Sequence, residues 1–185
     1  REPIAVYGDY DADGVTSTAL LVTVLRRLGG QVTSFLPSRF DDGYGLSVEG
    51  LQRCIQQGRP SLIVTVDCGT SSVEAVRKAA EAGIDVVVTD HHELTGEAAP
   101  AHALVNPKLG APEAVSLLAG VGVAFKLCHA LVKAGLEQGR ETAKAIDLRE
   151  QLDLVAIGTV TDIVPLTGVE PPKGELEHIH YFCGN

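Results

Sequence analysis

Carboxylate side chains gather directly after the first apolar run of the chain. Residues 7–14 read Tyr-Gly-Asp-Tyr-Asp-Ala-Asp-Gly, which places Asp9, Asp11 and Asp13 at alternating positions. Residues two apart in an extended segment point to the same side, so we expect the three carboxylates to converge. Hard divalent cations prefer such oxygen ligands. The segment therefore predicts a cation site, and the competing interpretation is a solvated, aspartate-rich loop.

Two more clusters of ionisable residues follow later apolar runs. Asp67 comes directly after residues 62–66, and Asp90, His91 and His92 come directly after residues 86–89. Asp162 lies in an otherwise apolar stretch, where a buried carboxylate must be paired or metal-bound. Each cluster alone also fits a capping or solvated role. Together, imidazole and carboxylate ligands suit manganese, iron or zinc, and the excess of carboxylates favours manganese or magnesium.

The hydrophobic periodicity predicts the elements that must position these residues. Apolar runs rich in β-branched residues indicate strands at 4–8, 31–36, 62–66, 86–89 and 103–105. Amphipathic patterns indicate helices at 16–28, 47–57, 73–82, 123–134 and 142–155. This alternation predicts an α/β fold, a doubly wound and mostly parallel sheet with flanking helices. Ligands of such sheets bind beyond the carboxyl ends of the strands, so the ionisable clusters should meet at one edge.

Candidate substrate-binding residues lie beside the same strand ends. Gly69 and Thr70 precede a helix, whose N-terminal N–H groups can hold a phosphate; the alternative is an ordinary helix cap. Arg39 could bind a phosphate through both arms of its guanidinium group, and Tyr44 could support a base or a sugar. The alternative for these two residues is a surface loop. The glycine-spaced run at 118–126 indicates close helix packing rather than a dinucleotide site.

Composition limits the classes of protein that the chain can represent. Its net charge of −9 argues against a generic, basic nucleic-acid-binding protein, although two divalent cations would cancel the charge of about four aspartates. The apolar stretches are too short to span a membrane. The four cysteines are far apart and form no Cys-x-x-Cys pair, which favours free thiols in a reducing cytoplasm.

Four segments together resemble the motifs of a known family. Residues 8–14, 66–69, 90–92 and 158–162 resemble the motifs of the DHH phosphoesterases, and within them the chain is most similar to the catalytic core of the RecJ single-stranded-DNA exonucleases. Residues 37–39, 43–46, 105–108 and 120–126 support the narrower likeness. The resemblance implies a DHH core over residues 1–166, a poorly ordered tail over 167–185, and absence of the family's second domain, DHHA1.

The resemblance also implies a centre of two Mn²⁺ or Mg²⁺ ions. One ion would be held by Asp11 and Asp67. The other would be held by Asp13, Asp67, His91 and Asp162, with Asp67 shared. His92 would contact the scissile phosphate, while Asp9 and Asp90 would orient the ligands. Some family members carry a histidine where this chain has Tyr7, which would weaken binding of the first ion.

The implied activity is hydrolysis of single-stranded DNA from its 5′ end, releasing nucleoside monophosphates by a two-metal mechanism. The chain would be a cytoplasmic monomer whose partner is single-stranded nucleic acid. Alternatives are a DHH phosphodiesterase acting on short oligonucleotides or cyclic dinucleotides, a manganese pyrophosphatase, or a binding relative without catalysis. The residues leave open the polarity of digestion, the choice between DNA and RNA, and the physiological metal.

Overall fold

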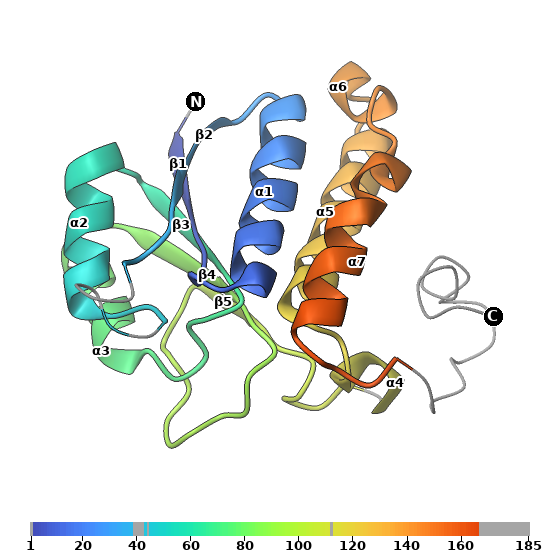
Figure 1. Cartoon of the computed structure of the whole chain (residues 1–185). Helices are drawn as coiled ribbons and strands as arrows, with labels where there is room; N and C mark the ends of the chain where they lie inside the picture. The colour runs from blue at the N-terminus through green and yellow to red at the C-terminus, as the bar shows by residue number, and fades with distance from the viewer. Residues whose placement is uncertain (1, 39–42, 44, 112, 167–185) are drawn as a thin grey trace.

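A single parallel sheet organises the chain. The computed structural model describes residues 2–38, 43, 45–111 and 113–166. The strands are β1 (Pro3–Tyr7), β2 (Gln31–Phe35), β3 (Leu62–Val66), β4 (Asp85–Thr89) and β5 (Ala103–Val105). They pair in the order β2-β1-β3-β4-β5, with every pairing parallel (Figure 1). The predicted parallel sheet is confirmed, and each strand boundary lies within one residue of its expected position.

Helices cover both faces of the sheet. The longer ones are α1 (Ala12–Arg27), α2 (Val48–Gly58), α3 (Val73–Glu81), α5 (Gly120–Glu137) and α7 (Leu152–Thr161). The shorter ones are α4 (Glu113–Ser116), α6 (Glu141–Lys144) and the 3₁₀ helix η1 (Leu148–Gln151). Figure 1 shows α2 and α3 on one face and α1, α5 and α7 on the other, and a hydrophobic core lies under each layer. Within the described residues, no helix combines the length and apolarity needed to cross a bilayer.

Two helices, α1 and α5, begin earlier in the chain than the sequence predicted. Helix α1 begins at Ala12, four residues before its expected start, because the Asp11 carboxylate accepts a hydrogen bond from Gly14 N and caps the helix. Asp13 is therefore helical, and the expectation that Asp9, Asp11 and Asp13 converge through an extended segment is wrong. Helix α5 likewise begins earlier than expected, at Gly120.

The single helix predicted over residues 142–155 is divided. Helix α6 ends at Lys144, and Asp147 then adopts an extended backbone. Its carboxylate accepts a hydrogen bond from Arg149 N, which starts η1 before α7 continues from Leu152. Aspartate side chains compete in this way with regular helical bonding, so hydrophobic periodicity alone did not reveal the break.

The topology defines where a ligand can be expected. The chain passes from β1 to β2 on one side of the sheet and then returns to place β3 on the other side of β1. The strand order thus reverses between β1 and β3. Open α/β sheets bind ligands at such a reversal, beyond the carboxyl ends of the strands. Asp9 and Asp67 directly follow this part of the sheet.

Tyr7 is a structural residue at the end of β1. Its side chain is fully buried, its ring centroid lies 5.1 Å from that of Phe35, and its hydroxyl donates to the Gly45 carbonyl at 3.1 Å. We predict that Tyr7→Phe destabilises the fold by about 1 kcal/mol through the lost hydrogen bond, or about 2–4 °C in melting temperature. Mn²⁺ affinity should stay unchanged in isothermal titration. Weaker Mn²⁺ binding at an unchanged melting temperature would contradict this structural role.

Candidate metal centre

Ligand atoms from distant segments meet at the carboxyl edge of the sheet. His91 Nε2 lies 3.1 Å from Asp67 Oδ1, 3.8 Å from Asp13 Oδ2 and 3.7 Å from Asp162 Oδ2. Asp13 lies in the first turn of α1, Asp67 follows β3, His91 follows β4, and Asp162 caps the C-terminus of α7. The structure therefore brings together four residues that span 150 positions of the chain, from Asp13 to Asp162.

These residues form two overlapping groups able to hold a metal ion. One contains Asp67, His91 and His92, and the other contains Asp13, His91 and Asp162, with the ligand atoms of each group within 4.8 Å of one another. The residue common to both groups is His91, whereas the resemblance implied that Asp67 is shared. The ligand roles themselves stay predictions.

Unsatisfied polar atoms indicate that these residues fit a cation. Both carboxylate oxygens of Asp67 and Nε2 of His91 are buried and make no well-aligned hydrogen bond among the described residues, although Asp67 Oδ1 and His91 Nε2 lie 3.1 Å apart. Burying a charged carboxylate without compensation is costly. A divalent cation bound by oxygen and imidazole nitrogen would satisfy all three atoms at once.

The backbone is strained at one candidate ligand and beside another. Asp67 adopts a left-handed conformation with φ of 62°, and Ile163, which follows Asp162, has φ of 59°. A β-branched residue rarely adopts a positive φ, and such strain persists only where surrounding contacts enforce it. The conformation turns the chain sharply at the end of β3 and keeps Asp67 in the buried cluster.

Burial and mutual repulsion govern the charge of the cluster. Desolvation, followed by the nearby charges of Asp13 and Asp11, raises the pKa of Asp67 to about 10 in the metal-free protein. Desolvation also raises the pKa of Asp13, against the effect of hydrogen bonds from Val121 and Gly120. A bound cation reverses this balance, because its charge favours the ionised carboxylates.

The N-terminus of α5 fixes the carboxylate of Asp13. Gly120 N donates to Asp13 Oδ2 at 2.6 Å, and Val121 N donates to Asp13 Oδ1 at 2.8 Å. A Cβ on Gly120 would lie 2.5 Å from Asp67 Oδ1, so the helix approaches this closely only with glycine. The glycine-spaced run was interpreted as close helix packing, but its contact with the cluster was missed. The two helical N–H groups bind the protein's own anion.

Asp90 orients the second histidine. Its Oδ1 accepts from His91 N at 2.7 Å and His92 N at 3.1 Å, and lies 2.8 Å from His92 Nδ1. Although burial alone would favour the protonated acid, hydrogen bonds from His92 and Thr70 hold the pKa of Asp90 well below its usual value. The same hydrogen bond raises the pKa of His92 to about 9. In the metal-free protein His92 is therefore cationic at neutral pH and suited to attract a phosphate.

The remaining predicted residues are placed as follows. The Asp11 carboxylate caps α1, and Asp11 belongs to neither ligand group. Asp9 is fully buried, with Oδ1 accepting from Tyr10 N and Oδ2 lacking a partner among the described residues.

Thr70 is only 1% exposed and its N–H donates to Asp90, so this N–H does not serve the expected phosphate cradle. Gly69 precedes it with φ of 112°. Arg39 and Tyr44 lie outside the described residues.

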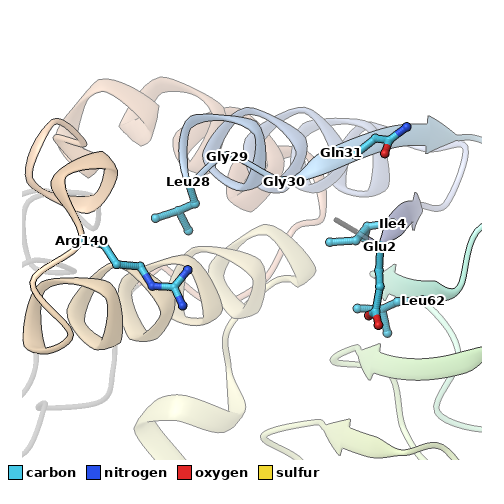
Figure 2. A pocket seen from close by; sticks show the side chains of 8 residues that line it. All are labelled: Glu2, Ile4, Leu28, Gly29, Gly30, Gln31, Leu62 and Arg140. Carbon is cyan, nitrogen blue, oxygen red and sulfur yellow. The ribbon is translucent and has the colours of Figure 1, made fainter.

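A pocket of about 360 Å³ lies away from this cluster (Figure 2). Ile4, Leu28 and Leu62 form apolar parts of its lining, and Glu2 and Arg140 lie on opposite sides of it. Ile4 and Leu62 belong to the amino-terminal ends of β1 and β3, whereas the ligand cluster lies beyond their carboxyl ends. The pocket therefore contributes nothing to the metal centre.

Two matched glycine variants test the contact between α5 and the cluster. We predict that Gly120→Ala weakens Mn²⁺ binding by about tenfold or more, because the added Cβ displaces the Asp67 carboxylate. Gly122→Ala is the control, since the atoms nearest to its Cβ would belong to the Leu118 side chain, at 3.1 Å and beyond, and not to the cluster. Titration calorimetry with Mn²⁺ measures both affinities. Equal loss in the two variants would contradict the proposed steric specificity.

The raised pKa of Asp67 predicts a trade between stability and metal binding. Because the folded pKa of about 10 exceeds the ordinary value of 3.8, the metal-free fold loses stability as pH rises between them. Asp67→Asn should therefore melt higher than the unsubstituted protein at pH 8, by about 2–4 °C for each kcal/mol recovered. Added Mn²⁺ should raise its melting temperature less than that of the unsubstituted protein, because Asp13, His91 and Asp162 remain. A lower melting temperature for Asp67→Asn in EDTA at pH 8 would show that burying this carboxyl group does not cost stability.

Comparisons with known proteins agree with this geometry. The DHH family, N-terminal domain, matches residues 3–159. The single-stranded-DNA-specific exonuclease RecJ of Bacillus subtilis is 46% identical over 90% of this chain and 20% of its own length. RecJ of Dickeya dadantii is 51% identical over 88% of this chain and 29% of its own length. The chain thus spans less than a third of these curated relatives.

Solved structures give the same result. A crystal structure of the exonuclease RecJ bound to manganese superposes with a TM-score of 0.76 and 37% identity. The match covers 90% of this chain and 40% of that one. The resemblance inferred from the four motifs is confirmed by sequence and by fold. With its parallel sheet and its aspartate- and histidine-bearing strand ends, this chain belongs to the DHH family.

Proposed function

We propose that this chain is the catalytic core of a metal-dependent phosphodiesterase that degrades single-stranded DNA from its 5′ end and releases nucleoside monophosphates. One observation carries the proposal: Asp67 and His91 bury ligand atoms without hydrogen-bond partners among the described residues, beside Asp13 and Asp162. The choice of substrate rests on relatives named as single-stranded-DNA-specific exonucleases.

The proposed centre takes two Mn²⁺ or Mg²⁺ ions. Asp13, Asp67, His91 and Asp162 would hold them, with Asp11 as a further ligand. When bound, the ions would supply charge stabilisation for the phosphate oxygens and lower the pKa of a bound water. The manganese-bound RecJ structure supports this choice of metal.

The protein side chains around the ions have separate tasks. Gly120 N and Val121 N hold Asp13 in one orientation, so its carboxylate does not reorganise as charge develops. Asp90 keeps His92 protonated and directed, and the imidazolium can bind a phosphate oxygen. Asp9, which is fully buried, would orient the ligands.

The acidity of the chain makes the cations necessary for binding as well as for chemistry. The net charge is −9, and the carboxylates of the cluster would repel a phosphodiester. Only His92 supplies a positive charge among the residues of the two ligand groups. We therefore expect single-stranded DNA to bind weakly in EDTA, with affinity rising as the metal sites fill.

The proposed setting is a monomer in the cytoplasm. Cys54, Cys68 and Cys128 are buried free thiols, which supports a reducing compartment. The continuous fold through Leu166 supports treating residues 1–166 as one core domain. The proposed tail at 167–185 lies outside the described residues.

The direct test is a metal titration with a 5′-labelled single strand. We predict mononucleotide products that require Mn²⁺ or Mg²⁺ and disappear in EDTA. Asp162→Asn should lower the rate by about 100–1,000-fold, since several kcal/mol of metal-derived stabilisation depend on its ligands. Asp153→Asn, an exposed position on the same helix, should retain the full rate.

The substrate is tested in the same assay. A single strand should be degraded faster than a duplex and faster than a dinucleotide. Preference for the dinucleotide would instead assign the chain to the phosphodiesterases of short oligonucleotides. Equal rates for Asp162→Asn and the unsubstituted protein would contradict the metal-dependent mechanism.

A further inference from the structure

Asn106 joins three loops at the carboxyl edge of the sheet. It directly follows β5 and is only 8% exposed. Its Nδ2 donates to Thr70 Oγ1 and to the His92 carbonyl oxygen, both at 2.8 Å, and its Oδ1 accepts from Lys108 N at 2.9 Å. These partners belong to the loops that follow β3, β4 and β5.

Asn106 and Asp90 both form hydrogen bonds to Thr70 and to His92, in the loops that follow β3 and β4. Asp90 Oδ2 accepts from Thr70 N at 2.9 Å, while its Oδ1 lies 2.8 Å from His92 Nδ1. Asp90 N in turn donates to the carbonyl of Val105, the residue before Asn106. Asp90 thus fixes the imidazole ring of His92, and Asn106 fixes the main chain of His92.

The contacts of Asn106 require an amide. Its NH₂ group has two hydrogens and meets two acceptors, and its oxygen meets a donor. Aspartate has the same shape and keeps an acceptor for Lys108 N, and the Thr70 hydroxyl can rotate to donate to it. Aspartate cannot donate to the His92 carbonyl, so this is the bond that the isosteric change removes.

We propose that Asn106 is a positioning residue for the phosphate contact of His92. The inference rests on the proposed function. Asn106 acts through the His92 main chain and through Thr70, and it belongs to neither metal-ligand group. Strand β5, which supplies no member of those groups, contributes to the site by delivering this amide.

The role predicts a loss of turnover without loss of metal. In the 185-residue chain, Asn106→Asp and Asn106→Ala should lower kcat by about 10–100-fold, the usual effect of removing an orienting partner. KM should change by less than about threefold. The Mn²⁺ dissociation constant, measured by electron paramagnetic resonance, should also change by less than about threefold. His102→Ala, an exposed substitution just before β5, is the control and should leave every value unchanged.

A spectroscopic measurement separates this role from simple loop anchoring. In the Mg²⁺-loaded protein, the His92 Nδ1–H bonded to Asp90 should give a protected downfield proton signal in histidine-labelled NMR spectra. We expect Asn106→Asp to broaden or remove this signal while the backbone amide spectrum stays folded. If Asn106→Ala does not fold, the spectrum of Asn106→Asp alone distinguishes positioning of His92 from loop anchoring.

The inference is overturned if kcat and the His92 signal both survive the substitutions, or if Mn²⁺ affinity falls in step with kcat. The latter would assign Asn106 to support of the metal ligands. If the unsubstituted chain hydrolyses no phosphodiester with any metal, the proposed function fails. The NMR comparison then decides alone whether Asn106 positions His92.

Discussion

The structure depends on the burial of several carboxylates and one imidazole in a space that compensates them only in part. Asp13 and Asp67 are almost completely inaccessible, and His91 Nε2 lies within 4 Å of both. Asp13 is partly stabilised by two N–H groups of α5, but the oxygens of Asp67 lack partners among the described residues. The metal-free fold therefore carries a local cost, which a bound cation would remove.

The surrounding fold keeps that arrangement from relaxing. The parallel sheet brings the ends of β1, β3 and β4 to one edge, and α5 and α7 close the cluster from the other side. Gly158 is part of this closure, since a Cβ there would lie 2.8 Å from Asp13 Oδ1. Around this core, Asp90 and Asn106 tie the loops after β3, β4 and β5 into one hydrogen-bonded unit. The unpartnered atoms of Asp67 and His91 thus lie where close packing and hydrogen bonds leave little room to rearrange.

Much of this arrangement could be predicted from the sequence. Buried parallel strands have a strong apolar signature, and the rule that ligands bind at their carboxyl ends placed Asp67 and His91 together, whereas Asp162, which follows a helix, was joined to them only by the family resemblance. Local hydrogen bonding was harder to predict. The cap at Asp11 moved Asp13 into a helix, and the turn at Asp147 divided another helix. Gly120 and Asn106 were noted as parts of motifs, but their contacts depend on side-chain geometry that a linear pattern does not contain.

Anomalous diffraction from crystals grown with Mn²⁺ tests the central claim most directly. We expect two strong peaks at the carboxyl edge of the sheet, one of them within bonding distance of Asp13, His91 and Asp162, with Asp67 contacting at least one ion. Absence of a peak near Asp67, with its oxygens instead hydrogen-bonded to water, would contradict the account. The cost of burying that carboxylate would then have a source other than metal binding.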